Sequence, residues 1–389
     1  MIPADRPLDV FIVAGEDSGD QLGFKLMRAL RAATGDHVRF AGVGGAAMAE
    51  EGLASLFPLR DIAVMGFLPV IARLPSLLKR IRETAEAAIK ARPDVLVIVD
   101  SPDFTHRVAR RVRRALPSLP ILDYVSPSVW AWRPGRSPAM RAYVDHVLAL
   151  LPFEPQAHRD LGGPACTYVG HPLIERIGEF RPDAAEAEAR EAIPPTVLVL
   201  PGSRRAEIAR LMPAFGETLA RVSAEVGPVD FVLPAVDHLA EAINAAIADW
   251  PVKPRIVLGE QAKWAAFRRA RAALAASGTV TLELALAGIP TVAAYRVNAI
   301  EAEIVRHILR VPSVLLPNII LGKQAMPEFL QQDCTPDRLA AALIPLVRGG
   351  LERERQCVEL AKLDDMMRLP DGVTPSDRAA QVILNMIRR

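Results

Sequence analysis

Residues Leu8–Asp20 read LDVFIVAGEDSGD, and this stretch predicts the fold. An apolar run at Leu8–Ala14 is followed by a turn at Gly15–Asp20 and by a helical pattern at Gln21–Ala33. An apolar strand that leads through a short turn into a helix is typical of a parallel sheet covered by helices.

The same alternation continues along the chain. In the first part we expect strands at Val38–Val43, Val95–Val99, Ile121–Val125 and His146–Leu150, with helices at Ile71–Arg92 and Thr105–Leu116. The pattern pauses near residues 162–172 and restarts after a charged, proline-containing stretch at 181–195. In the second part we expect strands at Thr196–Leu200, Asp230–Leu233, Arg255–Leu258, Ala272–Ala276 and Thr291–Ala294, with a helix at Ala206–Val226.

This pattern predicts the α/β class, with two doubly wound, Rossmann-like domains and a cleft between them. We expect the first domain at residues 1–170 and the second at 171–365. Residues 366–389 are expected to end in a helix that packs back on the first domain. Ligands of such sheets bind beyond the carboxyl ends of the strands, so the loops there are the places to search for function.

Composition disfavours several classes of protein. The 389 residues suffice for two domains of roughly 150 residues each. The formal net charge of +2 is too balanced for a typical nucleic-acid binder. The three cysteines (Cys166, Cys334 and Cys357) lack the spacing of a disulfide framework or a zinc site. Without a signal peptide or a long uncharged apolar run, we expect a cytoplasmic protein that is at most peripheral to a membrane.

The first loop carries three carboxylates, on Glu16, Asp17 and Asp20. They would repel a diphosphate, and the glycine pattern of a dinucleotide site is absent, which disfavours a dehydrogenase. Two interpretations remain. Ser18 or Asp20 caps the following helix, or the carboxylates accept hydrogen bonds from sugar hydroxyls.

Asp100 and Asp103 follow the very apolar strand Val95–Val99. A carboxylate at the carboxyl end of a strand, facing a cleft, is suited to act as a general base. The alternative is a capped turn before the next helix, a role that suits Asp103 better than Asp100. Because no metal-ligand cluster accompanies this pair, we expect neither a metal nor another cofactor.

The segment Tyr124–Arg133 is unusual for a loop, because it holds Trp130 and Trp132 and is followed closely by Arg136. Core packing of one tryptophan is the ordinary explanation. Two tryptophans beside two arginines also suit a wall that contacts a sugar or a phosphate.

Two loops of the second part favour phosphate binding. After Thr196–Leu200, the residues Gly202, Ser203 and Arg204 combine close backbone approach with a guanidinium that can hold phosphate oxygens. The residues Ser277, Gly278 and Thr279 precede a further helix, and Glu283 lies one turn into it, where its carboxylate could bind ribose hydroxyls. Either loop could instead be an ordinary strand-to-helix turn.

An apolar stripe with basic neighbours occupies the region 62–81. Its members at helical spacing are Phe67, Val70, Ile71, Leu74, Leu77, Leu78 and Ile81. Such a stripe is either core or an exposed ridge that dips into an anionic membrane surface.

Taken in order, these motifs resemble the lipid-A-disaccharide synthase family over nearly the whole chain, to about residue 345. The matching segments are Ala14–Glu16, Ser18–Asp20, Val64–Gly66, Asp100 with Pro102–Phe104, Tyr124–Arg133, Pro152–Glu154, Val169–Pro172, Leu200–Arg204, Ser277–Glu283, Leu316–Asn318 and Pro327–Gln331. Asp17 and Val280 depart from the usual pattern.

The resemblance implies the two-domain GT-B fold and an inverting glycosyltransferase. Its expected substrates are UDP-2,3-diacylglucosamine and the 6-hydroxyl of the lipid monosaccharide 2,3-diacylglucosamine 1-phosphate, and its products a β-1,6 disaccharide and UDP. The residues that it implies are catalytic are Asp100, Asn318 and Arg204. Those expected on the acceptor side are Glu16, Ser18, Asp20, Asp103, Trp130 and Arg133. Those expected to bind the nucleotide are Gly202, Ser203, Arg204, Ser277, Gly278, Thr279 and Glu283. Peripheral contact with the inner face of the cytoplasmic membrane would give access to acylated substrates.

Two rival functions share parts of this pattern. A UDP-sugar 2-epimerase can have the same architecture and nucleotide site, but it needs no second sugar and no apolar ridge. A non-catalytic lipid or nucleotide carrier would bind UDP without releasing it from a UDP-sugar in the presence of an acceptor.

Overall fold

The computed structural model describes residues 6–62, 67–370 and 372–387. The chain divides into two compact units. Unit 1 consists of Met1–Ile174 together with Leu369–Arg389, and unit 2 consists of Glu175–Arg368. The expected end of the second domain, at residue 365, lies inside a helix that continues to Met367.

Unit 1 contains a six-stranded parallel sheet in the order β2-β1-β3-β4-β5-β6. Its strands are β1 (Leu8–Ala14), β2 (Val38–Val43), β3 (Val95–Val99), β4 (Ile121–Tyr124), β5 (His146–Ala149) and β6 (Ala165–Tyr168). Ala14 pairs with Val99, and Val99 pairs with Tyr124. The carboxyl ends of β1, β3 and β4 are therefore level, which brings the loops after them to one edge of the sheet.

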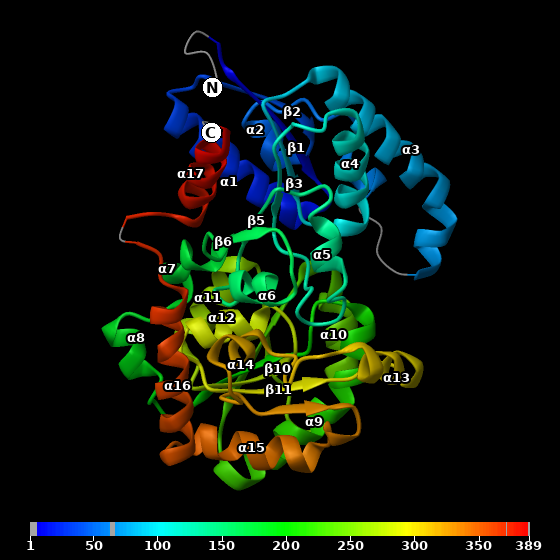
Figure 1. Ribbon diagram of the computed structural model, residues 1–389. Helices are drawn as coiled ribbons and strands as arrows, with labels where there is room; N and C mark the ends of the chain where they lie inside the picture. Colours follow the sequence, from blue (N-terminus) through cyan, green and yellow to red (C-terminus); the bar gives the residue numbers. More distant parts are fainter. Residues whose placement is uncertain (1–5, 63–66, 371, 388–389) are drawn as a thin grey trace. The chain divides into compact units, whose positions relative to one another are not determined.

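Alternation along β1 explains the layers of unit 1. Val10 and Ile12 share a core with residues of α1 and α17, whereas Phe11 and Val13 share a core with residues of α3 and α4. In Figure 1 these two pairs of helices lie on opposite sides of the sheet. The C-terminal helix α17 packs against α1, with Ile383 completely buried in their shared core. The helices of unit 1 are α1 (Asp17–Thr34), α2 (Ala46–Glu50), α3 (Phe67–Ala91), α4 (Pro102–Ala115), α5 (Arg136–Met140), α6 (Glu154–Asp160) and α17 (Pro375–Ile387), with short 3₁₀ turns at Leu59–Asp61 and Pro172–Ile174.

Unit 2 repeats this design with the strand order β12-β11-β10-β7-β8-β9, again all parallel. Its strands are β7 (Thr196–Leu200), β8 (Asp230–Ala235), β9 (Arg255–Leu258), β10 (Ala272–Ala276), β11 (Thr291–Tyr295) and β12 (Glu328–Leu330). The helices are α7 (Ile177–Phe180), α8 (Ala184–Ala189), α9 (Arg205–Val226), α10 (Ala240–Ile247), α11 (Glu260–Arg269), α12 (Val280–Leu286), α13 (Ala299–Ile308), α14 (Leu316–Leu321), α15 (Pro336–Arg348) and α16 (Leu351–Met367), with 3₁₀ turns at Asp237–Leu239 and Gln331–Asp333. Helices α9, α10 and α15 cover one face of this sheet, and α11 and α12 pack on the other.

The expected strands are confirmed, with small corrections at their ends. The pause near 162–172 contains β6, a short strand without the continuous apolar run of its neighbours, and β12 also lacks such a run. Strand β4 ends at Tyr124 because Val125 has a positive φ of 86° and so leaves the sheet. Helix α1 begins at Asp17, four residues earlier than expected, and α4 begins at Pro102.

Candidate active site

Asp100 lies at the carboxyl end of β3, in a backbone conformation that few non-glycine residues adopt. Its φ is 54°, and that of Ser101 is 43°. The Asp100 N–H donates to the carbonyl of Tyr124 over 3.0 Å, and Thr105 Oγ1 donates to the Asp100 carbonyl over 2.6 Å. These bonds hold a turn whose two left-handed residues each cost on the order of 1–3 kcal/mol. Such strain is common where a side chain has to be aimed for function.

Three polar side chains converge in this turn. Ser18 Oγ donates to Glu16 Oε1 over 2.6 Å and lies 3.4 Å from Asp100 Oδ2. Burial first, and then the nearby charge of Glu16, raise the pKa of the Asp100 carboxyl to about 6, although a hydrogen bond from the Ser101 N–H lowers it. A carboxylate with a pKa near 6 is still ionised at neutral pH, yet it binds a proton more readily than an ordinary aspartate.

The close approach of two loops requires Gly15. A Cβ atom at this position would overlap the side chain of Ser101. The glycine after β1 therefore allows the Glu16–Ser18 segment to lie directly against the Asp100 turn.

Asp20 has a different environment from Glu16 and Ser18. Its buried carboxylate accepts hydrogen bonds from the backbone N–H groups of Gly45, Ala47 and Met48, at 2.7–3.1 Å. It thus secures the start of α2. The alternative in which Ser18 or Asp20 caps α1 is wrong, since the N-cap is Glu16 and no side-chain bond caps that helix.

Helix α6 anchors the tryptophan-containing loop. Trp130 donates from Nε1 to Glu154 Oε1 over 3.1 Å and packs edge-on against Phe153. Burial raises the pKa of the Glu154 carboxyl to about 7. Ser126 Oγ lies 2.8 Å from Nε2 of His158, whose pKa is lowered by burial. Trp130 is thus held in place by one hydrogen bond and one aromatic contact, both from the start of α6.

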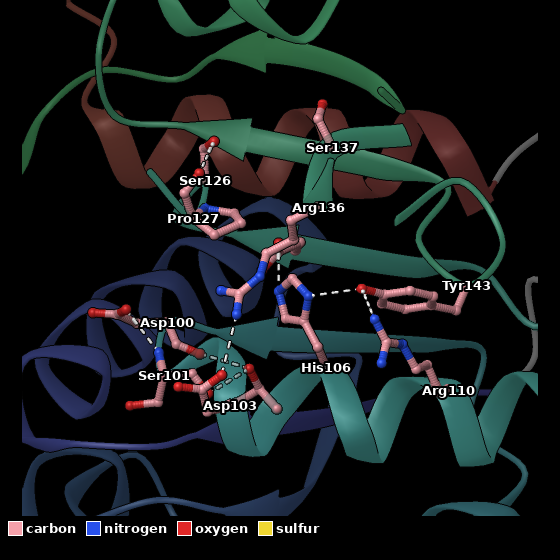
Figure 2. A network of polar contacts seen from close by, with 12 residues as sticks. Asp100, Ser101, Asp103, His106, Arg110, Ser126, Pro127, Arg136, Ser137 and Tyr143 are labelled. Carbon is pink, nitrogen blue, oxygen red and sulfur yellow. Dashed lines mark hydrogen bonds and ion pairs between the residues drawn. The ribbon is translucent and has the colours of Figure 1, made fainter. Parts of the chain in front are cut away.

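Arg136, which follows this loop, contacts the first turn of α4, as Figure 2 shows. Arg136 Nη2 donates to Asp103 Oδ1 over 3.1 Å, and Arg133 Nη1 lies 4.0 Å from the same oxygen. Arg133 also lies over the ring of Trp132, 4.0 Å from its centroid. Trp132 is the more exposed of the two tryptophans.

A buried polar network lies behind the Asp100 turn (Figure 2). His106 Nδ1 lies 3.0 Å from the Tyr143 hydroxyl, which accepts a hydrogen bond from Arg110. His106 Nε2 is 3.0 Å from Asp123 Oδ2, a distance that permits an ion pair. Its alignment is too poor for a hydrogen bond, so the Asp123 carboxylate has no hydrogen-bond partner among the described residues. Sequence reasoning missed this network, because His106 and Asp123 occupy a helix and a strand without any recognisable motif.

Unit 2 contains a cavity of about 820 Å³ at the carboxyl ends of β7, β8, β9 and β10. Its wall includes the expected residues Gly202, Ser203, Arg204, Ser277, Gly278, Thr279 and Glu283, together with Glu207, His238 and Lys263. The volume is that of a small-molecule site. Four separate stretches of sequence meet here because their strands are parallel neighbours.

Four charged side chains of this cavity are paired within unit 2. Arg204 Nη1 donates to Glu207 Oε1 over 2.8 Å, although the arginine side chain is 64% exposed. Lys263 Nζ donates to Glu283 Oε2 over 2.6 Å. Gly202 has a φ of 111°, and a Cβ there would meet the side chain of Glu207. Sequence reasoning missed Lys263 and Glu207, because each lies on a helix with an ordinary pattern.

Asn318 is not among the residues that line this cavity. Its buried amide Oδ1 accepts hydrogen bonds from the N–H groups of Ala325 and Met326, and Nδ2 donates to the Met326 carbonyl. These bonds hold the loop after α14.

The apolar stripe is divided between core and surface. Leu77 is half-buried against the core of unit 1, whereas Leu74 and Leu78 are 43% and 40% exposed. The side chains of Phe67, Val70 and Ile71, and the segment Val64–Gly66, lie outside the described residues. No helix in the described part of the chain is long and apolar enough to cross a membrane. Nor do three potential ligand side chains gather anywhere in these residues as a metal site would require.

Solved structures resemble the fold. The glycotransferase of kitacinnamycin has a TM-score of 0.60 at 19% identity, covering 98% of this chain and 99% of its own. The calicheamicin glycosyltransferase CalG4 has a TM-score of 0.58 at 16% identity, covering 99% of both chains. A UDP-GlcNAc 2-epimerase from Neisseria meningitidis, bound to UDP-GlcNAc, has a TM-score of 0.57 at 11% identity, covering 98% of this chain and all of its own. Two Rossmann-like units, each built on a sheet of parallel strands, define the GT-B fold class.

Sequence relatives identify the family. Residues 10–376 match the family model of lipid-A-disaccharide synthetase. A lipid-A-disaccharide synthase of Nitrobacter hamburgensis is 59% identical over 375 residues, which cover 96% of this chain and 94% of the relative. One of Rhodopseudomonas palustris strain HaA2 is 56% identical over 380 residues, covering 98% and 96%. The chain belongs to the lipid-A-disaccharide synthetase family and is a glycosyltransferase.

Proposed function

We propose that this enzyme transfers 2,3-diacylglucosamine from UDP to the 6-hydroxyl of 2,3-diacylglucosamine 1-phosphate, which forms the β-1,6 lipid A disaccharide and UDP. Family membership supports the overall reaction. The observation that carries the assignment of roles is Asp100, a strained strand-end carboxylate whose pKa is raised to about 6 by burial first and then by Glu16.

The base step uses Asp100. Its carboxylate takes the proton of the acceptor hydroxyl while that oxygen forms a bond to the anomeric carbon of the donor. The bond from this carbon to the diphosphate breaks, and its electron pair leaves with UDP. Attack from the face opposite the leaving group inverts the anomeric centre.

Unit 2 is proposed to hold the UDP of the donor. The cavity at the ends of β7 and β10 offers the backbone of Gly202, Ser203, Gly278 and Thr279. Arg204 would exchange Glu207 for diphosphate oxygens, since a guanidinium can bind two of them at once. Glu283 is proposed to bind the ribose hydroxyls, and Lys263 to balance the added negative charge. In this role the side chains neutralise the leaving group without a metal ion.

The acceptor is proposed to bind beside the Asp100 turn, with Glu16, Ser18 and the Trp130–Arg133 segment around its sugar. For Asn318, the family pattern supports a place near the reacting sugars. The exposed Leu74 and Leu78, with the exposed cations Lys79 and Arg82 beside them, support peripheral contact with the inner face of the cytoplasmic membrane.

A direct assay tests the reaction. The protein is incubated with UDP-2,3-diacylglucosamine and the monosaccharide 1-phosphate in the presence of EDTA, and the products are measured by mass spectrometry. We expect UDP and a disaccharide 1-phosphate in equal amounts. An isomerised UDP-sugar formed without acceptor would indicate an epimerase, and a bound but unchanged UDP-sugar would indicate a carrier. A strict need for added divalent cation would contradict the metal-free mechanism.

A further inference from the structure

Two guanidinium groups converge on one carboxylate oxygen close to Asp100. Arg136 and Arg133, from the segment after β4, both approach Oδ1 of Asp103, at 3.1 and 4.0 Å. Asp103 lies in the first turn of α4, only three residues after Asp100. Figure 2 shows the Arg136 side chain extending from its own segment toward the turn that holds Asp100 and Asp103.

The three side chains differ in exposure. Arg136 is largely covered, with 16% of its side chain exposed, and Arg133 is 50% exposed. Asp103, their shared partner, is 80% exposed. For both guanidinium groups, Asp103 is the only acidic partner among the described residues. The packing of Arg133 on the ring of Trp132 limits where that guanidinium can point.

This arrangement has more positive than negative charge. Two cations share one carboxylate, so the cluster of Arg133, Arg136 and Asp103 has a net positive charge. An ion pair with so exposed a carboxylate contributes little stability and exchanges readily. A phosphomonoester carries up to two negative charges and three acceptor oxygens, and guanidinium groups bind such oxygens in pairs. It would therefore compete well with Asp103 for both arginines.

We infer that Arg133 and Arg136 form a subsite for the phosphomonoester of the acceptor sugar, and that Asp103 occupies this subsite until the acceptor binds. The inference rests on the proposed function, which places the acceptor hydroxyl at Asp100. A hexopyranose carries its anomeric oxygen and its 6-hydroxymethyl group on the two carbons that flank the ring oxygen. An acceptor that is fixed by its phosphate would therefore hold its 6-hydroxyl close to this subsite, where Asp100 can reach it.

The test compares two acceptors with the full-length protein. One is 2,3-diacylglucosamine 1-phosphate, and the other is the same sugar without its phosphate. For each, kcat/KM is measured from UDP release at saturating UDP-sugar. The variants are Arg133→Gln and Arg136→Gln, with Arg107→Gln as the matched control, because Arg107 is an exposed arginine on the same helix as Asp103. Melting temperatures establish that each variant is folded.

We expect the unmodified enzyme to prefer the phosphorylated acceptor strongly. Each subsite substitution should reduce this preference at least about tenfold, chiefly through a higher KM for the phosphorylated sugar, since hydrogen bonds to charged groups are worth this much. Arg107→Gln should leave the preference as it is. Asp103→Asn should lower the KM for the phosphorylated acceptor, because it removes the internal competitor.

Other outcomes would overturn the inference. Equal losses of kcat/KM with both acceptors would show that the arginines have a structural role. An unchanged preference for the phosphorylated acceptor would exclude them from phosphate binding. If Arg136→Gln does not fold, the more exposed Arg133 decides the question alone. Turnover without any preference for the phosphate would remove the subsite and leave the proposed reaction intact. Failure to release UDP with either acceptor would instead refute the proposed function itself, and the subsite with it.

Discussion

The Asp100 turn of unit 1 and the cavity of unit 2 hold their charges in opposite ways. Around Asp100, a buried carboxylate is kept beside the carboxylate of Glu16 by a strained backbone, and its pKa is raised. In the cavity, four charged side chains form two ion pairs, Arg204 with Glu207 and Lys263 with Glu283. The ionised form of Asp100 is destabilised until it gains a proton. The charged groups of the cavity, in contrast, stay paired with one another until a ligand displaces one of them. A base and an anion site require these different starting states.

The largest effect should come from removing the strained carboxylate. We expect Asp100→Asn to lower kcat about 10²–10⁴-fold, because proton abstraction by a positioned side chain contributes that much. UDP affinity, measured by calorimetry, and the melting temperature should stay close to those of the unmodified protein. If turnover is retained, Asp100 is not the base.

The next effect concerns the exchangeable pair in the cavity. Arg204→Met should lower kcat/KM for the UDP-sugar about 10²-fold, a typical loss for one donor that stabilises a developing charge. Arg204→Lys should recover only part of this, because an ammonium group keeps the charge but loses the planar fork. Kinetics that are identical for all three proteins would place the diphosphate elsewhere.

A smaller effect should separate Asp100 from its neighbour. Activity should fall as pH drops through about 6, since protonated Asp100 cannot accept the hydroxyl proton. Glu16→Gln removes a negative charge that raises the pKa of Asp100, so the acidic limb of the kcat/KM profile should move to lower pH. A limb that stays in place, or moves upward, would contradict the coupling of the two carboxylates.

The smallest effect is expected from the two exposed leucines of the apolar stripe, Leu74 and Leu78. Replacing Leu74 and Leu78 with Ser should weaken binding to vesicles of anionic phospholipid, and each change should cost within about 0.5 kcal/mol because both side chains are exposed. Leu77→Ser is the matched control. It packs on the core, and its loss should cost on the order of 1–2 kcal/mol, or several degrees of melting temperature.

Vesicle sedimentation and thermal melting separate these outcomes. If the double variant binds vesicles as well as the unmodified protein, Leu74 and Leu78 are not part of a membrane contact. If it melts as early as Leu77→Ser, both leucines belong to the core.

Much of the fold could be predicted because parallel strands buried on both faces are continuous apolar runs. Val95–Val99 and Ala272–Ala276 are examples, and both are completely or almost completely buried. The exceptions were β6 and β12, short strands at the edges of their sheets, where fewer neighbours demand apolar side chains. Loop composition likewise singled out Gly202–Arg204 and Ser277–Thr279, which line the cavity of unit 2.

The sequence by itself therefore determined the α/β class, the positions of most strands along the chain and the loops in which the candidate site residues lie, because burial and strand-to-helix turns leave local patterns. Only the tertiary structure decided what each side chain contacts. Asp20 and Glu16 stand in one loop, yet one secures α2 and the other faces Asp100. The two arginines after Trp132 meet Asp103 from another element. Such pairings depend on which strands are neighbours and on where their ends align, and no local pattern encodes that.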